Sequence, residues 1–200
     1  MPITKAGLPT MTATIPAPTK LRLITTNEYH RMAEVGILSP DERVELIAGQ
    51  IIQKMPKGPR HSALCKRIEK LIERLLGDKV LVRLQDPIQL DLYSEPEPDI
   101  VVAHPNASFY VDHHPTPNEI YLIVEIADST IERDLGFKAD LYAAVGVADY
   151  WVLNVQAQQL HIFRQPQADG YQRQMILKGQ QSANLLAFPE CSITVQSCFG

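Results

Sequence analysis

The sequence predicts an α/β (α+β) domain in which helices flank a mixed central sheet, with an antiparallel extension at the C-terminal end. Residues 60–76 repeat apolar side chains with the spacing of a helix that buries one face. Residues 121–126 are apolar on both faces, as expected of a central strand. Shorter apolar runs precede and follow these segments, so helix and strand signals alternate along the chain. That order is typical of a mixed sheet covered by helices.

The first 20 residues differ in composition from the rest of the chain. They hold four of its 15 prolines among threonine and alanine, and they show no apolar periodicity. Residues 1–20 are therefore predicted to be a flexible leader. Residues 21–200 are expected to form a single domain, because a chain of this length holds one hydrophobic core.

A short helix and a hairpin are the first predicted elements. Residues 25–28 read Thr-Thr-Asn-Glu and resemble a helix N-terminus, in which a hydroxyl or amide caps the first turn and an acid lies near its positive end. Apolar runs at residues 44–47 and 50–52 flank Gly49, which predicts two strands joined by a tight turn.

Two longer helices and several strands follow. Gly77 is expected to end the helix of residues 60–76, and Gly146 to end a helix over residues 134–145. The buried stripe of the first helix is predicted to contain Leu64, Ile68, Leu71, Ile72 and Leu75. The remaining strands are predicted at residues 80–82, 88–90, 100–102, 150–153, 160–163 and 171–177.

The bulk composition argues against several classes of protein. A formal net charge of −4 is unlike a protein that coats nucleic acid through its whole surface, although it permits a local basic groove. No run approaches the ~20 apolar residues that span a bilayer, and no secretory signal pattern is present, so a cytoplasmic protein is expected. Cys65, Cys191 and Cys198 form no CxxC pair, which predicts reduced thiols rather than disulfides or structural zinc.

Two carboxylates stand beside the most apolar strands. Asp99 precedes residues 100–102, and Glu125 lies near the end of residues 121–126. An acid in such surroundings is costly to bury unless it is paired or bound to a cation. Mg²⁺ prefers one or two carboxylates together with waters and phosphate oxygens, so Asp99 and Glu125 are candidate metal ligands. A turn-capping acid and a lysine-paired acid are the respective alternatives.

Lys138 is the third candidate residue. It lies four residues after Asp134 and four before Tyr142, so the three side chains share one side of a helix. If that helix packs on the sheet, the ammonium group can reach the two carboxylates. There it could orient or deprotonate a water molecule, or stabilise charge on phosphorus. An ordinary ion pair with Asp134 is the alternative.

These residues together resemble a known nuclease superfamily. Pro-Asp at residues 98–99 and Val-Glu-Ile at residues 124–126 are similar to the PD-(D/E)xK pattern, with the lysine displaced to the next helix as Lys138. The order and spacing of motifs over residues 122–153 resemble the Uma-two family of restriction endonuclease-like proteins. This resemblance extends from about Thr26 to the C-terminus.

The resemblance implies a restriction-endonuclease-like core and Mg²⁺-dependent hydrolysis of DNA phosphodiester bonds, with Mn²⁺ able to substitute. It matches Glu45 to a hairpin glutamate that would assist the metal site, and His61 to a histidine at the start of the first long helix. A partly exposed strand acid and a first-turn histidine without function are the alternatives. The family often has Ser-Pro-Ser where residues 127–130 read Ala-Asp-Ser-Thr, which alters a loop beside the site.

A locally basic stretch surrounds His61. Its members are Lys54, Lys57, Arg60, Lys66, Arg67, Lys70 and Arg74, opposed only by Glu69 and Glu73. Lys57, Arg60 and His61 are candidate contacts for DNA phosphates, with a solvated helix face as the alternative.

Several other notable residues are predicted to be structural. Tyr142 and Trp151 are expected in the core, and Glu95 and Glu97 are expected to be solvated acids in a Pro-rich turn. Residues 113–114, two histidines in the predicted loop of residues 104–118, have no spaced partners and are expected to bind no metal.

Three hypotheses for function follow from the sequence. The first is a metal-dependent DNA endonuclease. The second, motivated by the low positive charge, is a catalytically silent module on the same fold that binds nucleic acid or protein. The third is an interaction protein that forms a homodimer by pairing the apolar strands of residues 160–177 across an edge.

Overall fold

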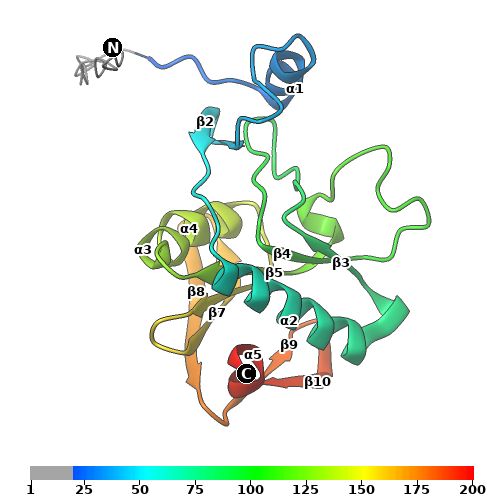
Figure 1. Cartoon of the computed structure of the whole chain (residues 1–200), viewed down its shortest axis with the longest axis vertical. Coiled ribbons are helices and arrows are strands. Elements are labelled where there is room, and N and C mark those ends of the chain that lie inside the picture. The colour runs from blue at the N-terminus through cyan, green and yellow to red at the C-terminus, as the bar shows by residue number, and fades with distance from the viewer. Residues whose placement is uncertain (1–19) are drawn as a thin grey trace, which may run out of the picture.

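The computed structural model describes residues 20–200 and shows a six-stranded mixed sheet between helices (Figure 1). The strands lie in the order β3 (Leu81–Leu84), β4 (Ile100–Ala103), β5 (Ile120–Ala127), β6 (Asp149–Asn154), β7 (Gln159–Gln167) and β8 (Gly170–Lys178). β5 and β6 run parallel, whereas the other neighbouring pairs are antiparallel. The predicted fold class is confirmed. The predicted leader, residues 1–20, lies outside the described residues except for Lys20.

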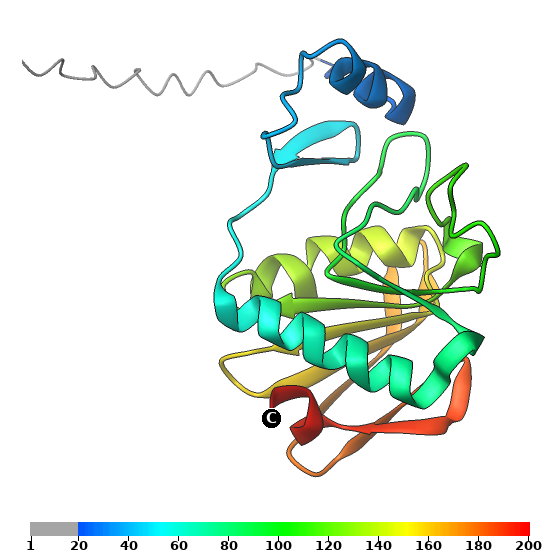
Figure 2. The ribbon, with the colours of Figure 1, turned by 45° about the vertical axis from the view of Figure 1, so that its right-hand side comes forward.

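Helices cover both faces of this sheet (Figure 2). On one face, α2 (Pro59–Leu76) packs against side chains such as Val124. On the other face, α3 (Ile131–Leu135) and α4 (Phe137–Ala144) pack against side chains such as Ile123. Successive residues of a strand point to opposite faces of the sheet, so β5 must be apolar throughout to fill both cores.

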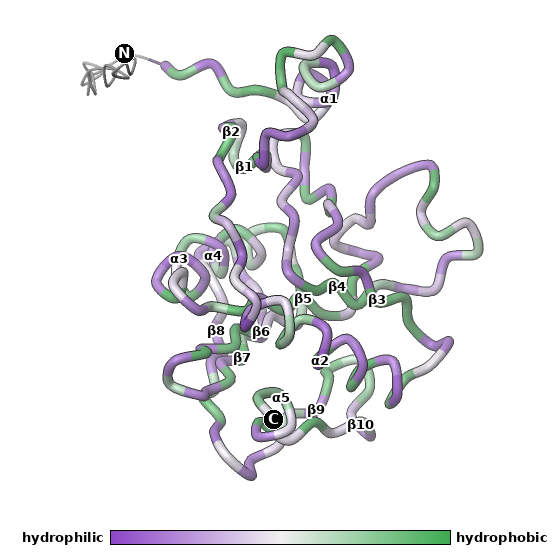
Figure 3. Tube along the Cα trace, viewed as in Figure 1, coloured by the Kyte–Doolittle hydropathy of each residue, from purple (hydrophilic) through white to green (hydrophobic). Residues whose placement is uncertain are grey.

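Smaller elements complete the core on the α2 side. β9 (Ser182–Leu185) and β10 (Phe188–Thr194) form a separate antiparallel pair, and α5 (Val195–Phe199) follows them. Two 3₁₀ turns, η1 (Gly77–Lys79) and η2 (Pro117–Glu119), precede β3 and β5. Figure 3 shows that β3 and β4 consist mainly of hydrophobic residues. Within residues 20–200, no helix is both long and apolar enough to cross a membrane.

The N-terminal elements form as their local sequence predicts. α1 (Thr26–Glu34) begins with a capping box, in which Thr25 Oγ1 accepts the N–H of Glu28 and the Glu28 carboxylate accepts the N–H of Thr25. β1 (Val44–Ile47) and β2 (Gln50–Gln53) form the expected antiparallel hairpin. Reciprocal capping and a tight turn are local interactions, so they need no tertiary partner to be recognised.

The predicted strand at residues 88–90 is wrong. Ile88 and Leu90 are buried, which explains their apolar pattern, but this segment lies in a loop. Their N–H groups donate to the carbonyls of Pro96 and Ser94, at 3.0 Å in both cases, instead of to a strand. The alternating apolar pattern of residues 88–90 thus indicates that these residues are buried, not that they pair in a sheet.

Two helix predictions also need correction. The helix predicted for residues 134–145 is split into α3 and α4 at Gly136, whose ψ of −94° lies outside the helical region. In α2, Leu76 completes the buried stripe, whereas the predicted Leu75 is 41% exposed. The buried positions 61, 65, 68, 72 and 76 follow spacings of three and four, which turn the stripe away from residue 75.

Candidate active site

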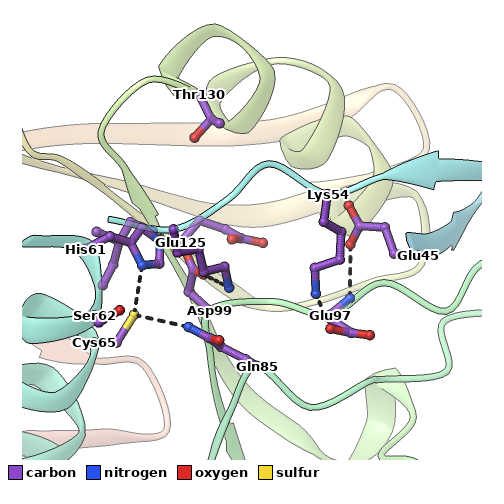
Figure 4. Close-up of polar contacts among 12 residues, drawn as sticks. Glu45, Lys54, His61, Ser62, Cys65, Gln85, Glu97, Asp99, Glu125 and Thr130 are labelled. Atoms are coloured by element: carbon purple, nitrogen blue, oxygen red, sulfur yellow. Dashed lines mark hydrogen bonds and ion pairs between the residues drawn. The ribbon is translucent and has the colours of Figure 1, made fainter. Parts of the chain in front are cut away.

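A cavity of about 110 Å³ lies near the end of β5. Its lining residues come from β1, β5 and α2–α4, and from the loops that precede α2, β4 and α3. Figure 4 shows His61, Asp99 and Glu125 together in this region, with Glu45 and Glu97 beyond them toward the β1–β2 hairpin. Segments that are far apart in the sequence therefore meet around one small space.

The strand register brings the two candidate metal ligands together. Ile100 of β4 pairs with Val124 of β5, so Asp99, one residue before β4, lies level with Glu125. Both residues line the cavity, and they are 5% and 3% exposed. The expected proximity of the two carboxylates is therefore present in the fold.

Asp99 is held by three donors. Lys57 Nζ lies 2.8 Å from Oδ1, while His61 Nε2 and the backbone N–H of Ile126 each lie 2.9 Å from Oδ2. Burial alone would raise the pKa of Asp99, but the hydrogen bond from His61 and the charge of Lys57 outweigh it and hold the pKa below its usual value. Asp99 is thus an ionised carboxylate at neutral pH.

Glu125 is held from α4. Lys138 Nζ donates to Glu125 Oε1 at 2.6 Å, and the Tyr142 hydroxyl donates to the same oxygen at 3.0 Å. Burial raises the pKa of Glu125 to about 8, against the lowering effect of the Lys138 charge. Among the described residues, no hydrogen bond reaches the second oxygen, Oε2. One carboxylate oxygen of this cavity residue is thus available to a further ligand.

Lys138 pairs with Glu125 of β5 and not with Asp134, four residues before it. Its side chain is 7% exposed and pairs with Glu125, whereas Asp134 accepts a hydrogen bond from Thr130. Burial lowers the pKa of Lys138, but the carboxylates of Glu125, Glu45 and Asp134 raise it more, so the pKa lies above its usual value. The i,i+4 ion pair with Asp134 is therefore not the arrangement in this fold.

Glu45 is buried at the cavity wall, contrary to the alternative of a partly exposed strand acid. It is 2% exposed, pairs with Arg133, and accepts the backbone N–H of Glu97 at 3.1 Å. Glu97 in turn pairs with Lys54, with side-chain exposures of 28% and 9%. The interpretation of Glu97 as a freely solvated acid is therefore wrong, because the fold turns it toward a buried lysine.

The three candidate phosphate contacts occupy different positions. Lys57 and His61 line the cavity and both bind Asp99. Arg60 lies outside the cavity lining and donates to the carbonyl of Val155 at 3.3 Å. Lys57 and His61 thus belong to the same cluster as the candidate metal ligands, and Arg60 does not.

The cavity has the donor chemistry of a site for a hard divalent cation. Its acidic lining residues are Glu45, Glu97, Asp99, Glu125, Asp128 and Asp134, and its Lys and Arg residues are Lys54, Lys57, Arg133 and Lys138. The lining thus has six carboxyl groups against four Lys and Arg side chains, an excess of oxygen ligands for a cation. Carboxylate oxygens are the ligands that Mg²⁺ and Mn²⁺ prefer. The residues present therefore fit such an ion.

A second ligand combination at the same place is less suited to a metal. His61, Cys65 and Asp99 also have ligand atoms close to one another, and Cys65 Sγ lies 3.5 Å from His61 Nδ1. Burial raises the pKa of the Cys65 thiol to about 12, so the thiolate that a metal needs is scarce at neutral pH. The oxygen donors of Asp99 and Glu125 are the better ligands.

Sequence reasoning did not predict the carboxylate partners of three residues in this cluster. Tyr142 was expected only in the core, although its position four residues after Lys138 placed it on the same side of the helix. Lys54 and Arg133 pair with cavity carboxylates through tertiary contacts alone. No local pattern in the sequence marks these two residues for that position.

The fold also occurs in a solved structure. A crystal structure from Anabaena variabilis, titled as that of "a putative nuclease belonging to DUF820", superposes with a TM-score of 0.66 at 19% identity. The superposition covers 88% of this chain and 97% of that chain, which establishes a shared fold. No curated protein matches the sequence.

A sequence-family comparison identifies the relationship that the motifs suggested. The model of the Uma2 family, described as "Putative restriction endonuclease", matches residues 26–196. The match includes Asp99 just before β4, strand β5 with Glu125, and helix α4 with Lys138. The chain therefore belongs to the Uma2 family of restriction endonuclease-like proteins.

Proposed function

We propose that this protein is a divalent-metal-dependent DNA endonuclease that hydrolyses phosphodiester bonds. The observation that carries the proposal is the convergence of Asp99, Glu125 and Lys138 on one cavity. Lys138 Nζ lies 2.6 Å from Glu125 Oε1. Membership of the Uma2 family supports a nuclease-like activity. Glu45 is proposed to assist from the cavity wall.

Asp99 and Glu125 would hold the metal ion, Mg²⁺ or Mn²⁺. The excess of carboxylates in the cavity and the free Oε2 of Glu125 support this assignment. When bound, such an ion supplies Lewis acidity at the scissile phosphate and favours ionisation of the attacking water.

Lys138 is proposed to stabilise charge on the reacting phosphate and to orient the attacking water. Its raised pKa keeps the ammonium protonated, which favours hydrogen-bond donation over proton abstraction. In the reaction, the water oxygen forms a bond to phosphorus and loses a proton to solvent, the bond from phosphorus to one ester oxygen breaks, and that oxygen takes up a proton from solvent. Tyr142 and Arg133 position the carboxylates of Glu125 and Glu45 through direct contacts.

The start of α2 is suited to a phosphate beside these groups. Gly58 and His61 line the cavity at the helix N-terminus, and the first turn contains no acidic residue. Unpaired N–H groups and the helix dipole at such an end favour anions. Further along α2, a shallow depression is lined by Lys66, Arg67, Lys70 and Arg74, which could follow the DNA backbone.

The proposal is tested by plasmid cleavage with Mg²⁺ or Mn²⁺. The wild-type chain should cleave, and chelation should abolish cleavage. Lys138→Ala, which removes a donor to the transition state, and Glu125→Gln, which removes a metal ligand, should each lower the rate by at least about 100-fold. The exposed residues Glu132 and Lys79 offer matched controls, and Glu132→Gln and Lys79→Ala should cleave normally.

Two other results would redirect the interpretation. Salt-dependent DNA binding by the wild-type chain without any cleavage would favour a silent binding module on this fold. Cleavage that persists in Glu125→Gln with an intact circular dichroism spectrum would refute the assigned roles.

A further inference from the structure

A second group of metal-ligating side chains lies apart from the cavity of Asp99 and Glu125. His30 is in α1, Glu95 is between β3 and β4, and His114 is between β4 and β5. Their ligand atoms all lie within 4.8 Å of one another, and none of the three residues lines that cavity. The sequence offered no such group, because its members are separated by many residues.

Glu95 provides independent evidence that this group binds a ligand. The residue is only 4% exposed, so the prediction of a solvated acid is wrong. Its Oε1 lies 2.7 Å from His30 Nε2, whereas its Oε2 is buried without a hydrogen-bond partner in the described part of the chain. A buried carboxylate oxygen left unpaired is destabilising. A cation bound beside it would remove that penalty.

The main chain holds the three segments in place. Backbone hydrogen bonds join α1 to the loop before Glu95, Glu95 to β1, and the end of the His114 loop to the chain after β3. These bonds are Thr26 N to Leu92 O at 2.9 Å, Glu95 N to Leu46 O at 2.7 Å, and Gln89 N to Pro115 O at 3.0 Å. Figure 1 shows α1 beside the long loop that precedes β4. Side chains anchored in this way are partly preorganised for a ligand.

We propose that His30, Glu95 and His114 bind a divalent transition-metal ion, Zn²⁺ above all. Two imidazoles and one carboxylate are a zinc ligand set, whereas Mg²⁺ prefers oxygen donors. Ligand atoms around a tetrahedral Zn²⁺ lie about 3.3 Å apart, so small side-chain rotations adapt the observed group. The His30 side chain is 47% exposed, which gives the ion a path from solvent and leaves a fourth position for water.

The ion would fasten α1 and two loops to one another. The chain stretch that contains Glu95 continues to Glu97 and Asp99 at the cavity. Zinc binding is therefore expected to raise the thermal stability of the protein, as any ligand that prefers the native state does.

The test is a calorimetric titration of the full chain with Zn²⁺ after chelation. The wild-type chain should bind one equivalent that excess Mg²⁺ does not displace. His30→Ala and His114→Ala should each weaken binding by more than about 100-fold, since even indirect support of a metal ligand is worth 10–100-fold. His113→Ala is the matched control, because the adjacent, exposed His113 pairs with Glu119 and should leave zinc binding unchanged.

Two further measurements separate this site from the other one. Glu125→Gln should retain the zinc equivalent, and Co²⁺ bound in its place should show no thiolate charge-transfer band, which excludes Cys65 as a ligand. The proposal is overturned if the wild-type chain binds no Zn²⁺, or if the surface variant His30→Ala binds it as tightly as His113→Ala does. His30→Ala decides the question even if His114→Ala fails to fold.

Discussion

Asp149 is fully buried at the start of β6 and accepts hydrogen bonds from three other residues. Trp151 Nε1 lies 2.9 Å from Oδ1, Arg164 donates from both Nε and Nη2, and the N–H of Leu186 lies 2.8 Å from Oδ2. One side chain thus joins β6 to β7 and to the turn between β9 and β10. Burial raises the pKa of Asp149 despite Arg164, which shows how strongly the surrounding apolar core opposes its charge.

We expect Asp149→Ala to lower the free energy of unfolding by about 3–5 kcal/mol, because it leaves the largely buried Arg164 guanidinium unpaired. Urea denaturation measures the change. Asp169→Ala in an exposed turn is the control and should change it by less than about 0.5 kcal/mol. Equal effects of the two substitutions would show that the buried network contributes nothing specific.

The β1–β2 hairpin illustrates how an element depends on one glycine. Ala48 and Gly49 have φ angles of +48° and +72°, as a two-residue hairpin turn requires at both central positions. A Cβ atom on Gly49 would lie 2.5 Å from Leu23 Cβ, so the segment before α1 leaves room only for hydrogen. Because β1 carries Glu45, this turn also determines the cavity wall.

Gly49→Ala should therefore destabilise the protein more than a glycine replacement that introduces backbone strain alone. Gly179→Ala is the matched comparison, since Gly179 has φ +57° but nothing within 4 Å of the added Cβ. The difference in unfolding free energy between the two variants should be at least about 1 kcal/mol, the usual scale of overpacking. If Gly49→Ala is no worse than Gly179→Ala in urea, the contact with Leu23 is not limiting.

At the scale of the whole molecule, the six-stranded sheet contributes side chains to two hydrophobic cores, one on each face. Val124 and Trp151 point into the core under α2, while Ile123 and Val152 point into the core under α4. Neither core can form without the shared strands, so we propose that residues 21–200 unfold as a single cooperative unit.

The single tryptophan makes this prediction simple to check. Trp151 lies in the α2-side core, so its fluorescence reports that core, whereas far-ultraviolet circular dichroism reports all helices and strands. The two thermal transitions should coincide. Separate midpoints would divide the chain into independent units and contradict the proposal.

Local patterns in the sequence predicted most elements of this fold correctly. The helix start at residues 25–28, the hairpin turn at Gly49 and the apolar strand of residues 121–126 all formed as expected. Helix caps and turns depend on neighbouring residues, and continuous apolarity marks a strand buried on both faces. The sequence also placed Asp99, Glu125 and Lys138 as one group, and the fold brings them together, while their catalytic roles remain a prediction.

By itself, therefore, the sequence determined most of the elements, the family resemblance and the carboxylates expected at the site. Only the tertiary structure decided which residue pairs with each buried carboxylate. Lys138 binds Glu125 and not Asp134. Glu95 is buried beside His30 and His114. The physical reason is that periodicity reports whether a position is buried, whereas the partner of a buried charge is set by how distant segments pack.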